Sequence, residues 1–138
     1  MSNKHKNKTL AAFLSLILGS LGAHRFYLYG KRDPIARLHF ASLPISILLS
    51  KLYFNLDPFI TYAPWILSLL TSFAMCLVLG LKSDEKWDAQ FNATSGETSD
   101  TSWPLALIVV TALACAAITL LFILARGMDL LLTGGAYG

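Results

Sequence analysis

The chain has 138 residues, of which 55% are hydrophobic and only 14% are charged. Soluble domains carry about 25% charged residues, so a composition of long apolar blocks with few charges excludes an ordinary soluble domain. Basic residues dominate the chain up to Lys51 and acidic residues dominate the remainder. Because the basic residues flank apolar runs, we expect them to meet lipid headgroups and exclude a nucleic-acid partner.

Residues 1–8 form a polar, basic N-terminal tail, and the first apolar run follows directly. A cleaved signal peptide is one interpretation of this run, but Leu21 stands where the cleavage site would need a small residue. We favour an uncleaved first helix over about 9–29, with the aromatic residues near its end in the interfacial zone.

The second helix is expected over about 35–54. Asp33 and Pro34 are typical of a helix start, because the carboxylate accepts hydrogen bonds from free amides and proline fits the first turn. Pro44 predicts a kink. The segment also holds His39 and several serines, which makes it the least lipid-like of the apolar runs.

A third helix is expected over 59–81, a stretch without a charged residue. The segment 82–102 is acidic and rich in Ser and Thr, which predicts a mobile aqueous loop. A fourth helix is expected over 103–126, and a flexible tail over 127–138. Since backbone hydrogen bonds must be satisfied inside lipid, the four runs predict an all-α integral membrane protein, a small bundle of about four transmembrane helices.

The first apolar run ends in a glycine-rich and aromatic motif that resembles the TM2 domain family, small membrane proteins named for two helices joined by a short polar turn. The resemblance covers roughly residues 8–81, weakens after Gly30, and implies membrane residence, which we expect to be in the cytoplasmic (inner) membrane of a bacterium. Family members often carry an Asp three residues after a Trp, whereas here Ser68 follows Trp65. A role that needs a buried carboxylate is therefore in doubt. The matching residues are Gly19, Gly22, His24, Arg25, Phe26, Tyr27 and Gly30.

The charged and aromatic part of this motif is open to three interpretations. It could anchor the helix end at the membrane interface, with Arg25 reaching the phosphates. It could instead be a structural ion pair or a site for a ligand or lipid headgroup. Arg37 lies four residues after Asp33, so these two could also pair on a helix surface. The candidate ion-pair residues are Arg25, Asp33, Arg37 and Asp57.

Small residues recur at helical spacing in the first and last helices, which favours close packing against another helix. For the first helix, a dimer face or a simple helix end at Gly22 is also possible. Cys76 and Cys115 lie within apolar runs and are interpreted as packing residues. The candidate packing residues are Ser15, Ala23, Thr111, Ala112, Cys115, Ala116 and Thr119.

The sequence offers no nucleophile with a base, no phosphate-binding glycine loop and no metal-ligand spacing, so we expect no enzyme, cofactor or metal site. The leading hypothesis is a scaffold or accessory subunit that contacts the lipid bilayer and other membrane proteins or itself, with no small-molecule substrate. The alternatives are a subunit of a small transporter or channel, and a lipid-headgroup-binding protein. Basic residues are divided almost equally between the two faces of a four-helix arrangement. The densely basic turn after the first helix slightly favours placing that turn and the acidic loop in the cytoplasm.

Overall fold

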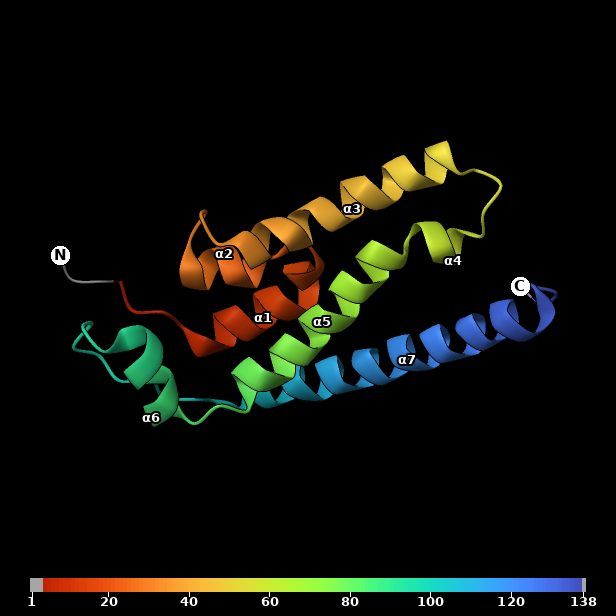
Figure 1. Cartoon of the computed structure of the whole chain (residues 1–138). Helices are drawn as coiled ribbons and strands as arrows, with labels where there is room; N and C mark the ends of the chain where they lie inside the picture. Colours follow the sequence, from red (N-terminus) through yellow and green to blue (C-terminus); the bar gives the residue numbers. More distant parts are fainter. Residues whose placement is uncertain (1–3, 138) are drawn as a thin grey trace.

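The computed structural model describes residues 4–137, and its regular structure over that range is helical. Two short helices come first, followed by three long ones (Figure 1). Between the second and third long helices, the segment 82–102 forms a small cap at one end of the bundle. The all-α architecture predicted from the sequence is therefore confirmed. In chain order the elements are α1 (Lys8–Leu18), the 3₁₀ turn η1 (Gly19–Leu21), α2 (Ala23–Tyr29), α3 (Pro34–Leu52), α4 (Pro58–Thr61), α5 (Ala63–Gly80), α6 (Asp84–Trp87), the π-helical turn η2 (Asp88–Asn92) and α7 (Trp103–Thr133).

The first apolar run is a hairpin of two short helices, which differs from the continuous helix expected over 9–29. α1 ends at Leu18, and Gly22 adopts a left-handed backbone (φ 78°) that turns the chain back. The amide of Asn7, before α1, donates to the hydroxyl of Tyr27 in α2 at 2.8 Å. The end of α2 therefore lies beside the beginning of α1. With 11 residues, α1 is about 16 Å long and reaches only about halfway through a 30 Å hydrocarbon core.

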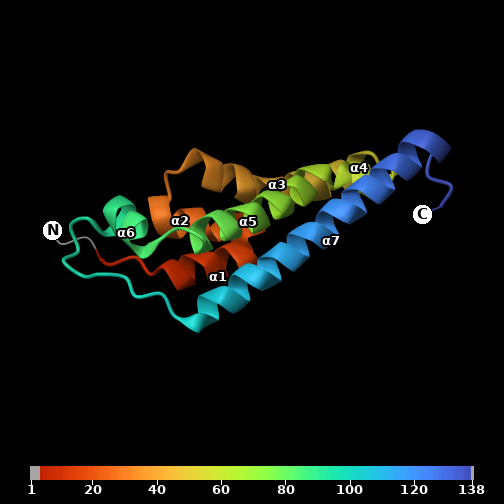
Figure 2. The same ribbon diagram turned by 90° about the horizontal axis from the view of Figure 1, so that it is seen from below.

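Three helices are long and apolar enough to cross a membrane: α3, α5 and α7. α3 begins as predicted at the Asp33 cap, whose carboxylate accepts from the amide of Ala36 at 2.8 Å, and it contains Pro44 without an interruption. α5 runs antiparallel to α3, and α7 packs along α5 on its other side (Figures 1 and 2). The chain is an integral membrane protein with three such helices and a shorter apolar helix, α1, which forms a hairpin with α2; the sequence predicted a small bundle of about four transmembrane helices.

The bundle has two distinct ends, and the described termini lie at opposite ones (Figures 1 and 2). We define the cap end as the one with the start of α1, the end of α2, the start of α3 and α6. The far end holds α4 and the C-terminal part of α7. Of the eleven Lys and Arg residues, only Lys51 and Arg126 lie at the far end.

The segment 82–102, for which the composition predicted a mobile aqueous loop, contains α6 and η2 and forms a cap that packs over the hairpin. Trp87 is fully buried, packs against Ala11 and Leu28, and donates its indole N–H to the carbonyl of Lys6 at 2.9 Å. Asn92 accepts from the amide of Lys6 at 2.7 Å and donates to its carbonyl at 3.1 Å. The N-terminal segment supplies these partners, so it orders the cap.

The far end is held by an ion pair between Arg126 of α7 and Asp57, the residue that caps α4. Arg126 also pairs with Asp129 one turn later. The guanidinium of Arg126 and the amide of Phe59 hold the pKa of Asp57 below its usual value. α7 continues to Thr133, beyond the end expected at residue 126, and Arg126 and Asp129 in its last part are paired.

Candidate functional site

The motif places two glycines where other residues would collide with neighbouring helices. A Cβ on Gly19 would lie 2.5 Å from the Cβ of Ser72 in α5. A Cβ on Gly22 would lie 2.6 Å from the carbonyl oxygen of Ala36 in α3 and would have to tolerate a φ of 78°. The hairpin turn is thus in close contact with both α3 and α5, and its glycines permit that approach.

Two histidines and a serine meet beneath this turn. His24 is fully buried, and its ring lies 5.8 Å from that of His39, edge to face. The Nδ1 of His39 lies 2.6 Å from the hydroxyl of Ser68, which donates to the carbonyl of Ser20 at 2.7 Å. Because Ser68 donates its proton to that carbonyl, Nδ1 of His39 is the protonated nitrogen of the ring. Among the described residues, neither ring nitrogen of His24 has a hydrogen-bond partner.

Arg25 of the motif forms an ion pair with Asp33, and this pair joins α2 to the start of α3. The Nε of Arg25 lies 2.7 Å from Asp33, and a second guanidinium nitrogen lies 3.2 Å from the same carboxylate. This bidentate contact holds the pKa of Asp33 below its usual value. The other two candidates for the pair are placed elsewhere. Arg37 donates to the carbonyls of Lys31 and Arg32, while Asp57 lies at the far end with Arg126.

The rest of the motif closes the hairpin at the cap end. Tyr27 accepts from the amide of Asn7 and packs, partly buried, against the Trp87 cluster. Phe26 is partly buried, and its carbonyl accepts from the amide of Gly30 at 3.0 Å. Gly30 has a φ of 86° and open space around its Cα, so its role is to turn the backbone.

The small residues are divided between packed and open positions. Ser15 is fully buried and donates to the carbonyl of Ser72 at 2.7 Å, and Ala112 is fully buried against α1 and α5. Thr111 is exposed and bonds within its own helix, so it is not part of the packed face. The remaining members are partly buried: Ala23, Cys115, Ala116 and Thr119.

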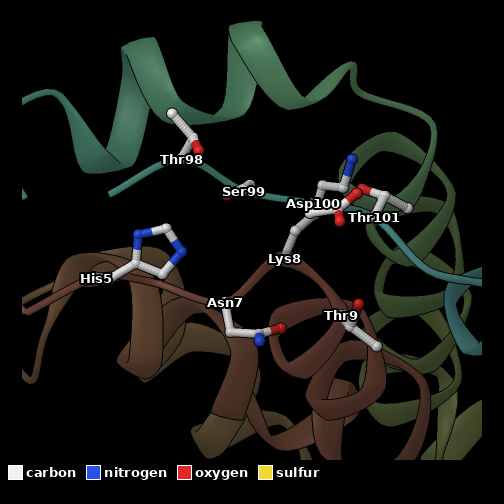
Figure 3. Close-up of a pocket in the computed structure, with 8 residues that line it drawn as sticks. All are labelled: His5, Asn7, Lys8, Thr9, Thr98, Ser99, Asp100 and Thr101. Atoms are coloured by element: carbon white, nitrogen blue, oxygen red, sulfur yellow. The ribbon is translucent and has the colours of Figure 1, made fainter. Parts of the chain in front are cut away.

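A small polar pocket of about 230 Å³ lies at the cap end, between the N-terminal segment and residues 98–101 (Figure 3). Lys8 lies at its edge and is already paired with Asp84 and with the carbonyl of Lys82. The side chains drawn in Figure 3 come from two segments that face one another across the pocket: His5, Asn7, Lys8 and Thr9 on one side, Thr98, Ser99, Asp100 and Thr101 on the other.

The geometry of the motif can be compared with known proteins. Residues 4–43 match the TM2 domain. The TM2 match takes in the N-terminal segment, α1, η1, α2 and the first half of α3, so it covers the whole hairpin of α1 and α2. The family resemblance seen in the sequence is confirmed over this segment, which is shorter than the residues 8–81 expected. No curated protein and no solved structure is similar enough to match the chain.

Several residues outside the TM2 segment that join the helices or the cap were not identified from the sequence. Ser68 was noted only as the place of a missing carboxylate, yet it bonds His39 and the hairpin turn. Gly80 allows α5 to approach α7, because a Cβ there would lie 2.3 Å from Cγ2 of Val109. Trp87 and Asn92 order the cap. Their partners lie more than 25 residues away along the chain, so local spacing gave no signal for them.

Proposed function

We propose that the chain is a non-enzymatic membrane module that acts as a scaffold or accessory subunit, through contacts with other membrane proteins or with a second copy of itself. The TM2 match and the membrane-span-like helices support membrane residence. We further propose the cytoplasmic (inner) membrane of a bacterium as its location, which fractionation of the native host's membranes tests.

The observation that supports this proposal is that the buried polar side chains hydrogen-bond to neighbouring helices or turns. Ser15 and Ser68 donate to carbonyls of a neighbouring helix or turn, and Cys76 donates to the carbonyl of Ala12 at 3.3 Å. Such contacts join helices to one another. A pore would instead present these groups to a continuous polar path, so the arrangement favours packing over transport.

The outer faces of the long helices are available for a partner. α7 buries little of its surface against the rest of the chain, and Leu113 and Leu121 are each more than half exposed. Leu48 on α3 is similarly exposed. A partner helix packed on either face would gain the van der Waals contacts that drive association in lipid.

In-cell photocrosslinking from Leu48 and Leu121 tests the proposal. We expect a photoreactive residue at either position to form discrete adducts with a membrane protein or with a second copy. The same residue at Ala12, which is fully buried inside the chain, is the matched control and should give none. Adducts with lipid alone would contradict the scaffold role. So would ion flux in proteoliposomes that is lost on changing Ser46 and Ser50 to Leu, because that result would establish the transporter alternative.

A further inference from the structure

We propose that the chain holds one anionic phospholipid, with an acyl chain in the groove between α3 and α5 and the phosphate at Lys31, Arg32 and Arg37. The groove includes His39 and Ser68 in its lining but lies apart from Leu48, Leu113 and Leu121, the exposed positions proposed above for a protein partner. The proposal rests on the shape of the groove and on the charge beside it.

The groove has a volume of about 360 Å³ and is lined mainly by apolar side chains. On α3 it extends from Ile35 to Ile45, ten residues that rise about 15 Å along the helix. It therefore runs from the cap-end surface to about the middle of a 30 Å hydrocarbon core. Leu38 and Leu67 on its two walls are 68% and 59% exposed, so the groove opens sideways to the lipid. An acyl chain that lies along the bilayer normal fits that direction.

Three positive charges lie within seven residues around the start of α3, next in the chain to Ile35, where the groove begins. Lys31, Arg32 and Arg37 are all exposed, and none of them meets a carboxylate among residues 4–137. The nearest acid in the chain, Asp33, is already occupied by Arg25. Arg37 folds back so that its guanidinium donates to the carbonyls of Lys31 and Arg32, which gathers the charge directly before Ile35.

The positive charge of Lys31, Arg32 and Arg37 also favours a lipid over a second copy of the chain as the occupant of the groove. A two-fold symmetric dimer formed through this groove would bring equal surfaces together, and two clusters of the same sign would repel. An anionic headgroup neutralises the cluster instead, and basic residues beside a transmembrane helix are attracted to anionic lipid. The combination of an apolar groove with basic residues beside it matches a phospholipid with one charged end.

Native mass spectrometry of the purified full chain in mild detergent tests the site. The protein is mixed with equal amounts of palmitoyl-oleoyl phosphatidylglycerol and palmitoyl-oleoyl phosphatidylcholine, and the retained lipid is identified. We expect one retained phosphatidylglycerol. Changing Lys31, Arg32 and Arg37 to Ser should lower the preference about fivefold for each charge removed. Lys4→Ser with Lys86→Ser, two exposed cap-end lysines away from the groove, is the control and should keep the preference.

The groove is tested by a second pair of variants. Leu38→Trp fills the groove and should abolish retention, whereas Leu48→Trp, on the same helix outside the groove, should leave it unchanged. Circular dichroism checks that each variant is folded, and all of these positions are exposed. Equal retention of the two lipids by the wild type, or an unchanged preference in the charge variant, would overturn the proposal. Retention that survives Leu38→Trp would overturn the assignment of the acyl chain to this groove.

Discussion

Gly22 in the hairpin turn approaches Ala36 of α3 so closely that a Cβ on Gly22 would lie 2.6 Å from the Ala36 carbonyl oxygen. The contact allows the hairpin turn to pack directly against α3. A Cβ on Gly22 would also lie 3.1 Å from the Cβ of His39, and Gly19, three residues earlier, lies against Ser72.

Gly22→Ala should destabilise the protein more than alanine at another left-handed glycine. The left-handed backbone alone costs about 1–2 kcal/mol for a residue with a Cβ, and the clash with Ala36 adds to it. Gly134→Ala carries the same left-handed backbone cost (φ 68°, ψ 20°) without a neighbour within 4 Å, and Gly127→Ala carries neither. Thermal unfolding in detergent should rank the three variants in that order, with Gly22→Ala the least stable. Equal melting temperatures for all three would show that the turn is not in contact with α3.

Gly80→Ala should push α5 away from α7, because its Cβ would lie 2.3 Å from Cγ2 of Val109. Val is stiff about χ1 and cannot easily rotate aside. Overpacking of this kind costs about 1–3 kcal/mol. Val109→Ala in the same chain removes the obstructing methyl group and should recover most of the lost melting temperature. If the double variant is as unstable as the sum of the two single variants, the close approach is not the cause.

Trp87→Ala should release the cap while leaving the three long helices folded. The fully buried indole packs against the hairpin and bonds the carbonyl of Lys6, and truncating a buried Trp costs about 3–5 kcal/mol. We expect faster hydrogen exchange in residues 4–8 and 84–101, with α5 and α7 unchanged. Trp103→Ala, at a 73% exposed position, is the control. Rapid exchange of the cap in the wild type would instead support the mobile loop that the composition predicted.

The cap should loosen in acid as Asp88 is protonated. The amide and hydroxyl of Ser99, at 2.6 and 2.5 Å, and the amide of Asn92 lower the pKa of Asp88 to about 2. A depressed folded-state pKa stabilises the cap fully above the ordinary value of about 3.9, and this contribution is lost as the pH falls toward 2.

Trp87 fluorescence in a Trp65→Phe/Trp103→Phe background reports this loss. The emission should shift to the red between about pH 4 and pH 2. Asp88→Asn lacks the titrating carboxylate, so its shift in that range should be smaller. The same profile in both proteins would contradict the role of Asp88. A residual shift is expected from Asp84, whose pKa is also lowered, by its contact with Lys8.

The three long helices were predictable because each contains a long apolar run with few charges, and such a run has few alternatives to a membrane helix. α3 even begins at the predicted Asp33 cap. The hairpin was not predicted, because Gly19 and Gly22 in an apolar run fit a packing stripe as well as a reversal of the chain. What decides between these is the position of Ser72 and Ala36, which local sequence does not contain.

The contacts of the site residues could also be predicted only where they are local. The pairing of Arg25 with Asp33 was among the arrangements considered, since the two lie eight residues apart around a short turn. Asp57 contacts Arg126, which lies 69 residues away along the chain, and Trp87 contacts Lys6, which lies 81 residues away. Contacts of that separation depend on how the helices assemble, so spacing along the chain does not reveal them.

We predict that the hairpin of α1 and α2 enters and leaves the membrane on the same side, and cysteine accessibility tests this directly. Single cysteines replace Lys4, Lys31, Ser95 and Tyr137 in turn and are labelled in intact cells with a membrane-impermeant maleimide; Cys76 and Cys115 lie within α5 and α7. Because all but two of the Lys and Arg residues lie at the cap end, the positive-inside rule places that end in the cytoplasm. We predict that positions 4, 31 and 95 are protected together and that position 137 is labelled. Labelling that separates position 4 from position 31 would show that the first apolar run crosses the membrane, and it would contradict the account.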